Sequence, residues 1–337
     1  MTSYIDVHHH LVPDFYVEAI GADAMHKQAP SYSSVALDWT PESSLQVMDE
    51  NGIASALLSI SAPGLWCGDP AATARLGRRC NDCMAVLIAR HPDRFGMFAA
   101  LPLPDIDATL AEIRYVAETL HADGFGLLSC YGNRHLGDPA FAPVFDALNA
   151  LGATVFVHPT VTDACRDLMP DFPASIMEFP FDTTRTVLSL LYSGTLTRCP
   201  GIRFVFSHAG GAVPFLAHRM ARLEQVPAFA AKTQGGALNL LRRHYYDCAL
   251  SANPPALDAL RALVPEDHIL YGSDFPFAPG MAGRTRRALD DYDPAGSLLP
   301  GIARANALAL FPRFAGADEG QRAAAAVIGR SDARHGG

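Results

Sequence analysis

Short apolar segments of β-branched and aromatic residues recur eight times along the chain, and helical patterns lie between them. The expected strands cover residues 4–9, 54–60, 95–101, 124–129, 153–158, 202–207, 245–249 and 268–272. The expected helices include 41–50, 70–90, 106–121, 139–151, 184–198, 212–225 and 254–263. Nearly continuous apolar strands that alternate with helices indicate a parallel sheet covered by helices. Eight such units favour an α/β fold of the (β/α)₈ TIM barrel type, which a chain of 337 residues is long enough to form.

The barrel is expected to occupy residues 1–313. Residues 11–53 are predicted to be an insertion after the first strand, because a long proline-containing stretch precedes the helix at 41–50. Residues 314–337 are rich in alanine, glycine and arginine, which predicts a C-terminal appendage. No repeat or linker divides the chain further.

Composition excludes several classes of protein. Hydrophobic residues make up 49% of the chain and charged residues 18%, which favours a large buried core over disorder. The net charge is −9, and only Lys27 and Lys232 are lysines, so neither nucleic acid nor an anionic membrane is expected as a partner. Apolar runs are too short to span a bilayer, and no secretory signal is visible before His8. These features predict a cytoplasmic protein.

The seven cysteines do not form the pattern of a disulfide framework. Cys80 and Cys83 have the spacing of a redox or zinc motif, but they share one helical stripe with Met84 and Leu87. A stripe of this kind is typical of the buried face of an amphipathic helix. We therefore expect both cysteines to belong to the core.

Polar residues stand at the ends of four of the expected strands: His8 and His10, His158, His208 and Asp274. Alternate residues of a strand face the same side, about 7 Å apart, so His8 and His10 can reach one ion. The carboxyl ends of barrel strands carry the active site. Histidines with one carboxylate suit Zn²⁺ or, alternatively, Mn²⁺. The third and fourth strands end without lysine or a carboxylate, which favours a single metal ion.

Four motifs resemble the amidohydrolase superfamily, and in particular its aminocarboxymuconate-semialdehyde decarboxylase branch. They are Asp6-Val7-His8-His9-His10, Val157-His158-Pro159, Ser207-His208-Ala209-Gly210-Gly211 and Gly272-Ser273-Asp274-Phe275-Pro276. Segments 58–64, 131–138 and 178–186 are similar to the members that resemble 6-methylsalicylate decarboxylase. The resemblance covers about residues 4–312.

This resemblance implies that His8, His10, His158 and Asp274 bind the metal and that His208 is an unliganded histidine beside it. It also implies a homodimer. By spacing, Ser44 stands where the name-giving decarboxylase has a substrate-binding arginine, which favours a small aromatic carboxylic acid over an acyclic substrate.

The expected reaction is the release of CO₂ from a hydroxybenzoate after a proton reaches the carboxyl-bearing carbon. Asp274 is the favoured proton donor, with His208 assisting, and no organic cofactor is needed. The candidate substrate contacts are Trp39, Trp66, Tyr131, Arg134, Phe181, Arg185 and Phe277. A metal-dependent lactonase or amidase, a hydratase and a non-catalytic metal-binding barrel stay open as alternatives.

Overall fold

Eight parallel strands form one sheet in the computed structural model, which describes residues 3–28, 36–169 and 171–316. Their order is β1-β2-β3-β4-β7-β8-β9-β10. The strands are β1 (Tyr4–His10), β2 (Ile53–Ser59), β3 (Phe95–Ala100), β4 (Gly124–Leu128), β7 (Thr154–His158), β8 (Arg203–Phe206), β9 (Tyr245–Asp247) and β10 (Ile269–Leu270). The eight expected strands are therefore confirmed to within two or three residues at each end.

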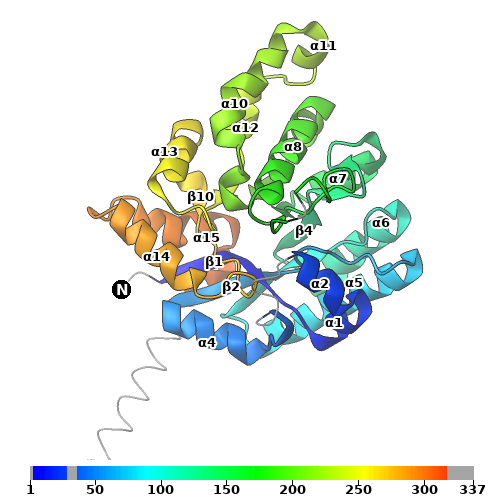
Figure 1. The fold of residues 1–337 in the computed structure, drawn as a ribbon, viewed down its shortest axis with the longest axis vertical. Helices are drawn as coiled ribbons and strands as arrows, with labels where there is room; N and C mark the ends of the chain where they lie inside the picture. Colours follow the sequence, from blue (N-terminus) through cyan, green and yellow to red (C-terminus); the bar gives the residue numbers. More distant parts are fainter. Residues whose placement is uncertain (1–2, 29–35, 170, 317–337) are drawn as a thin grey trace, which may run out of the picture.

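Backbone hydrogen bonds close the sheet between its first and last strands. The amide of Val7 donates to the carbonyl of Tyr271 at 3.1 Å, and beyond β10 the amide of Asp274 donates to the carbonyl of His8 at 2.8 Å. The result is the predicted TIM barrel, with helices around the strands (Figure 1). Closure at this edge brings residue 274 beside the end of β1.

The helices are α1 (Asp14–Ile20), α2 (Ala22–Gln28), α4 (Pro41–Asn51), α5 (Pro70–Arg90), α6 (Ile106–Tyr115), α7 (Ala142–Ala150), α8 (Glu178–Ser193), α9 (Thr195–Arg198), α10 (Val213–Ala221), α11 (Pro227–Ala230), α12 (Ala237–Arg242), α13 (Pro254–Leu263), α14 (Met281–Tyr292) and α15 (Asn306–Leu310). The hairpin of β5 (Cys130–Tyr131) and β6 (Arg134–His135) follows β4. No helix among the described residues is both long and apolar enough to cross a bilayer.

Local sequence explains where several helices begin. The Asp69 side chain accepts a hydrogen bond from the amide of Ala72, which caps α5, and Asn253 caps α13 in the same way through the amide of Ala256. α8 begins at Glu178, six residues before the expected start at 184. Pro180 is compatible with this start, because the first turn of a helix has amides without intrahelical partners.

The base of the barrel is closed by the segment that follows the last strand. Phe311 and Phe314 pack with Phe98 and Phe156 of the barrel interior. The guanidinium of Arg313 pairs with Asp123 and donates to the carbonyl of Phe95 at 2.8 Å. Phe314 thus packs in the barrel one residue beyond the expected boundary at 313, and residues 317–337 of the expected tail lie outside the described residues.

The cysteine prediction is confirmed. All seven cysteines are free. Cys80 is buried on α5 and Cys83 is half-buried there. Burial raises the pKa of the Cys80 thiol well above its usual value, so this side chain packs as a small apolar group.

His244 is a buried histidine that makes the fold sensitive to acid. Neither ring nitrogen has a hydrogen-bond partner, and Phe204 contacts the ring with centroids 5.2 Å apart. Burial, together with the positive charges of Arg243 and His268, lowers the pKa of His244 to about 3. The unfolded chain therefore binds this proton more tightly, and stability present above pH 6.5 is lost as the pH falls toward 3.

We expect His244→Leu to remove this component of the pH dependence. Between pH 7.5 and pH 5, the parent should lose about 2 kcal/mol of unfolding free energy more than the variant. Urea denaturation at both pH values measures the difference. The exposed His218 on α10 provides the control, because His218→Leu should change stability equally at both pH values. An unchanged acid sensitivity in His244→Leu would contradict this account.

Candidate metal centre

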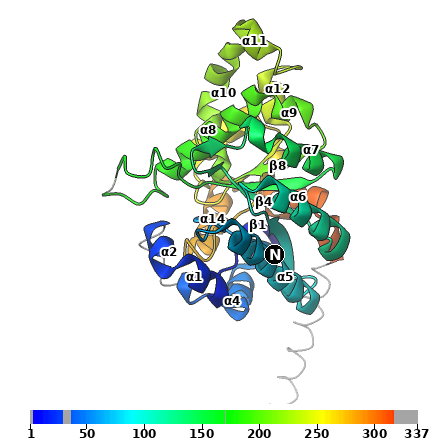
Figure 2. The ribbon, with the colours of Figure 1, turned by 90° about the vertical axis from the view of Figure 1, so that its right-hand side faces the viewer.

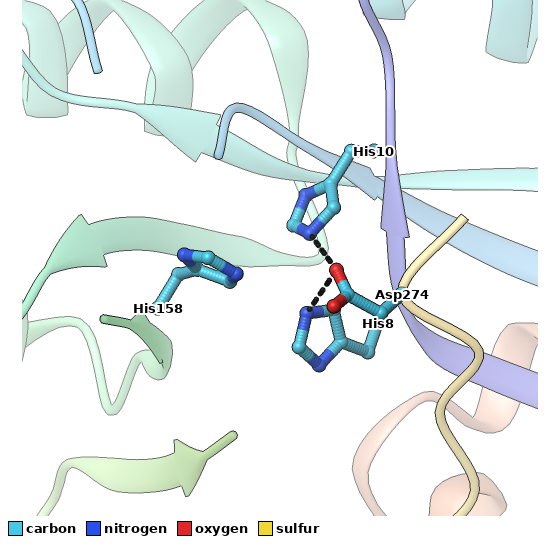
Figure 3. Close-up of side chains that lie close together, drawn as sticks. All are labelled: His8, His10, His158 and Asp274. Atoms are coloured by element: carbon cyan, nitrogen blue, oxygen red, sulfur yellow. Dashed lines mark ion pairs between the residues drawn. The ribbon is translucent and has the colours of Figure 1, made fainter. Parts of the chain in front are cut away.

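His8 and His10 lie on the same face of β1 and point toward Asp274 (Figure 3). The Nε2 atoms of His8 and His10 lie 3.3 Å and 3.2 Å from Oδ1 of Asp274. Asp274 has a φ of 60°, a left-handed conformation that aspartate tolerates better than most residues. The hydrogen bond from its amide to β1 holds it in this turn.

His158 completes the cluster from the end of β7, on the opposite side from β1 (Figure 3). Its Nδ1 lies 2.8 Å from the carbonyl oxygen of Pro159 and donates to it, which leaves Nε2 as the nitrogen with a free lone pair. One candidate ligand atom from each of His8, His10, His158 and Asp274 lies within 4.8 Å of the others. The structure thus brings together the four predicted ligands.

Three of these atoms are buried without a hydrogen-bond partner: Nε2 of His8, Nε2 of His10 and Oδ1 of Asp274. Buried polar atoms without a partner are costly in a folded protein. Three imidazole nitrogens and one carboxylate oxygen fit a divalent ion and leave room for a further ligand. The donor set therefore fits a single divalent metal ion, and it is the one such group found among the described residues.

The electrostatics of His10, His158 and Asp274 favour the protonation states that suit metal binding. Burial, which outweighs the attraction of the nearby Asp274 carboxylate, lowers the pKa of His10 to about 4. Burial also holds the pKa of His158 well below its usual value. Burial opposes ionisation of Asp274, but the charge of His8 and the close contacts with the neighbouring histidines lower its pKa well below the usual range. Neutral imidazoles and an ionised carboxylate are the forms that ligate metals.

Asp247, at the end of β9, orients two of the site histidines. Its carboxylate lies 2.9 Å from Nδ1 of His8 and accepts from the backbone amide of His208 at 3.1 Å. Burial disfavours a charge on His8, but Asp247 and Asp274 outweigh it and raise the pKa of His8 to about 10. A carboxylate behind a histidine fixes the ring nitrogen that faces the metal. Ser59 has the equivalent place behind His10, 2.8 Å from its Nδ1.

Neither Asp247 nor Ser59 was among the predicted site residues. The sequence does carry a signal for Asp247, because a carboxylate follows the apolar residues of the seventh strand. Ser59 has no comparable signal.

We expect Asp247→Asn to weaken metal binding by about 10- to 100-fold, because a neutral amide oxygen is a weaker acceptor for Nδ1–H of His8 than the carboxylate. Competition with a chromogenic chelator measures the affinity for Zn²⁺ and Mn²⁺ directly, without turnover. Asp107→Asn, at an exposed position of α6, is the matched control and should bind both ions as the parent does. Equal affinities in Asp247→Asn and the parent would show that Asp247 does not position the ligand.

His208 lies beside the four ligands, in a tight turn after β8. Its Nε2 is 3.4 Å from Oδ2 of Asp274, whereas the contacts of His8 and His10 are with Oδ1. Its Nδ1 is buried without a hydrogen-bond partner. The residue has a φ of 54°, a strained conformation that is stabilised by the hydrogen bond to Asp247. His208 is therefore placed to exchange a proton with Asp274.

His9, between the two ligands of β1, faces the other side of the strand. Its Nε2 lies 3.0 Å from Oγ of Ser44, and its Nδ1 lies 3.1 Å from Oδ2 of Asp6. Trp39 donates from Nε1 to the same serine oxygen at 2.9 Å. Asp6 also accepts from the hydroxyl of Ser273 at 2.6 Å. This buried network fixes β1 against the turn that carries Asp274, and Ser44 belongs to it.

A cavity of about 280 Å³ opens onto the metal ligands. It is lined by His158, His208 and Asp274, by the serines 61, 175 and 251, and by the apolar residues Ala62, Ile176, Phe179, Pro180, Leu250, Phe277, Ala278 and Met281. None of these lining residues is an arginine or a lysine.

Of the seven predicted substrate contacts, Phe277 lines this cavity. Trp66 and Tyr131 line a different cavity, of about 350 Å³, formed by the loops after β2, β3, β4 and β7. The other four lie outside both: Trp39 is buried against Ser44, Arg134 is exposed on β6, Phe181 is 41% exposed on α8, and Arg185 pairs with Glu178 at 3.6 Å. Phe179, Leu250 and Met281, which were not predicted, line the metal cavity.

The barrel and this donor set define a metal-dependent enzyme with its site at the carboxyl ends of parallel strands. The chain belongs to the amidohydrolase family, whose sequence profile matches residues 5–313. Within the family it falls in the decarboxylase branch that its motifs indicated.

Two fungal relatives match nearly the full chain. Decarboxylase yanB of Aspergillus niger is 40% identical over 329 residues, which cover 92% of this chain and 88% of the relative. The 6-methylsalicylic acid decarboxylase acuB of Aspergillus aculeatus is 37% identical, with coverage of 92% and 96%. The fold is similar to that of a crystal structure of 2,6-dihydroxybenzoate decarboxylase complexed with 2,6-dihydroxybenzoate, with a TM-score of 0.80, 22% identity and coverage of 93% and 100%.

Proposed function

We propose that the chain is a metal-dependent, non-oxidative decarboxylase of a small hydroxybenzoate of the 6-methylsalicylate type. This proposal rests on the cavity and the group of three histidines and one aspartate beside it. These four residues can hold a divalent metal ion, and much of the cavity wall is apolar. Because no lysine or arginine is among the described residues that line the cavity, the metal would be the cation available to the substrate carboxylate. The similarity to a 6-methylsalicylic acid decarboxylase supports this choice of substrate.

The ion would be held by His8, His10, His158 and Asp274. We propose Zn²⁺, with Mn²⁺ as the alternative, because the set is rich in imidazole. When bound, the ion supplies Lewis acidity that orients the carboxylate and the neighbouring phenolic oxygen and stabilises their negative charge. The reaction needs no organic cofactor.

The two oxygens of Asp274 have different roles in the proposed reaction. Oδ1 lies near His8 and His10, whereas Oδ2 lies near His208, and Asp274 lines the cavity. Oδ2 takes the phenolic proton of the substrate and delivers it to the ring carbon that bears the carboxylate. The carbon–carbon bond to the carboxylate then breaks, its electrons restore the aromatic ring, and CO₂ leaves. His208 returns a solvent proton to the phenolate, so that atoms and charges balance.

Phe179 and Phe277 are proposed to hold the flat ring in the cavity, since both line it. A hydratase acting on an unsaturated diacid would need several cationic side chains in the cavity, which the lining residues do not provide. A lactonase or amidase would use the same ligands but consume water in place of releasing CO₂.

The test is to load the protein with Zn²⁺ or Mn²⁺ and to follow 6-methylsalicylate, salicylate and 2,6-dihydroxybenzoate by mass spectrometry. We expect loss of CO₂ from 6-methylsalicylate, and we expect a chelator to abolish it. Protein that holds one metal ion per chain and leaves all three acids intact would overturn the proposal. Lactone and amide substrates assayed in parallel would then identify a hydrolase.

We further propose that the enzyme is a cytoplasmic homodimer. The seven free cysteines support a reducing compartment.

Exposed apolar residues, among them Leu168, Phe172 and Ile176, gather in the connection between β7 and α8, which projects from the body of the protein (Figure 2). Clustered exposed apolar residues are typical of contact surfaces between proteins. Sedimentation equilibrium tests the dimer, and a monomer at micromolar concentration would exclude it.

A further inference from the structure

Leu250, which the proposed mechanism does not use, combines a place in the cavity wall with an unusual backbone conformation. It follows β9, it lines the metal cavity together with Phe277 and Met281, and its side chain is 43% exposed. Its φ is 55°, in the left-handed region. That conformation is unfavourable for a bulky residue, and such outliers concentrate at binding and catalytic sites.

The turn around Leu250 is fixed from both sides. On one side, the amide of Ala249 donates to Oδ1 of Asp247 at 2.9 Å, so the carboxylate that orients His8 also holds this turn. On the other side, the amide of Asn253 donates to the carbonyl of Ser251 at 2.9 Å, and Asn253 caps α13. The strained conformation is therefore imposed by the surrounding structure, which keeps an apolar side chain in the cavity wall.

This placement has a consequence for the ring of the substrate. If its carboxylate and adjacent hydroxyl are directed at His158 and Asp274, the rest of the ring faces the walls of the cavity. Serines 61, 175 and 251 also line the cavity, but the side chains of Leu250, Phe277 and Met281 offer no hydrogen-bond donor or acceptor from oxygen or nitrogen. A hydroxyl that enters such surroundings loses its hydrogen bonds to water, whereas a methyl group gains from burial.

We propose that Leu250 is a specificity-determining residue. With Phe277 and Met281 it forms an apolar subsite for the second ortho substituent of the ring, and it selects methyl over hydroxyl at that position. This inference rests on the proposed function, because it assumes that a hydroxybenzoate occupies the cavity.

The substrates 6-methylsalicylate and 2,6-dihydroxybenzoate test the subsite, because they differ by a methyl and a hydroxyl of nearly equal size. We expect the parent to favour 6-methylsalicylate in kcat/KM by about 10- to 100-fold, the range that an apolar pocket achieves against such a pair. Leu250→Asn keeps the approximate size of the side chain and suits the left-handed backbone. It should reduce the preference at least about fivefold, while kcat/KM for salicylate, which lacks the substituent, changes less than about threefold.

Leu151→Asn is the matched control, because Leu151 is 49% exposed and lies after α7, before the first residue of β7. It should leave the preference unchanged. If Leu250→Asn slows both ortho-substituted substrates equally, or leaves their ratio at the parent value, Leu250 does not determine specificity.

Binding of the two products separates this inference from the proposed function. Calorimetry with 3-methylphenol and resorcinol measures the same methyl-to-hydroxyl preference without turnover. If the parent releases no CO₂ from any of the three acids, the proposed function fails. A preference for 3-methylphenol that is lost in Leu250→Asn would still support the subsite, and equal ratios in both proteins would overturn it.

Discussion

Asp274→Asn should lower kcat for 6-methylsalicylate by at least about 10³-fold, which is within the range for loss of a group that transfers protons in the reaction. The amide retains an oxygen that can face His8 and His10, as Oδ1 does in the parent. It cannot accept a proton from the phenolic hydroxyl or deliver one to the ring carbon. The substitution therefore separates the proposed proton-transfer role of Asp274 from its place among the ligands.

Metal content must be measured on the same preparation, because a variant that fails to bind the ion would be inactive for a different reason. Atomic absorption on protein dialysed against excess Zn²⁺ or Mn²⁺ provides this value. His208→Gln serves as the comparison. It removes the group beside Oδ2 of Asp274 but no ligand, so we expect a smaller loss of about 10²-fold. Appreciable turnover by metal-loaded Asp274→Asn would exclude Asp274 as the proton donor.

The metal ligands could be predicted from the sequence because a barrel imposes a simple rule. Each strand is short, apolar and easily recognised, and every strand directs its carboxyl end to the same face. His158 stands at the end of β7, and His8 and His10 lie two residues apart on β1. Their convergence needs no detail of side-chain packing.

The residues that form hydrogen bonds with the histidines of β1 could not be predicted in this way. Asp247 and His8 are 239 residues apart, and their hydrogen bond exists because the barrel closes. Ser44 illustrates the same limit. By spacing it stands where the name-giving decarboxylase has a substrate-binding arginine, and the structure shows it buried between His9 and Trp39. Contacts of this kind depend on how Trp39 and α4, which carries Ser44, pack against β1.

The walls of the cavity depend on where loops and helices begin. The earlier start of α8 places Phe179 in the cavity and leaves Phe181, two residues later, exposed. A shift of two positions rotates a side chain by about 200° around a helix axis. The sequence identified the aromatic residues near the strand ends, but the direction of each side chain was determined by the start of the helix.

Gly211 is a second position at which the structure predicts a large effect, this time on stability. It follows His208 in the turn after β8 and has a φ of 63°. A Cβ at this position would clash with the carbonyl group of Pro180 in the first turn of α8. The amide of Ala212 donates to Oγ1 of Thr184 at 2.9 Å, so the turn and the helix are also joined by a hydrogen bond.

Gly211→Ala should therefore lower the free energy of unfolding by at least about 3 kcal/mol, through the strained backbone and the displacement of α8. Gly152→Ala is the matched control, because Gly152 has a φ of 60° and a Cβ added there would meet nothing within 4 Å beyond its chain neighbours. It should cost only about 1 to 2 kcal/mol, the strain of a left-handed residue. Urea denaturation of the two variants at pH 7.5 measures both values.

The difference between these two variants is the energy of the contact between the turn and α8. Because α8 carries Phe179 and Pro180 into the cavity, Gly211→Ala should also raise KM for 6-methylsalicylate at temperatures where it stays folded. Gly152 lies between α7 and β7, so Gly152→Ala should leave KM unchanged. Equal losses of stability with equal KM values would mean that α8 adjusts freely to the added methyl group, and that the turn after β8 does not hold the cavity wall in place.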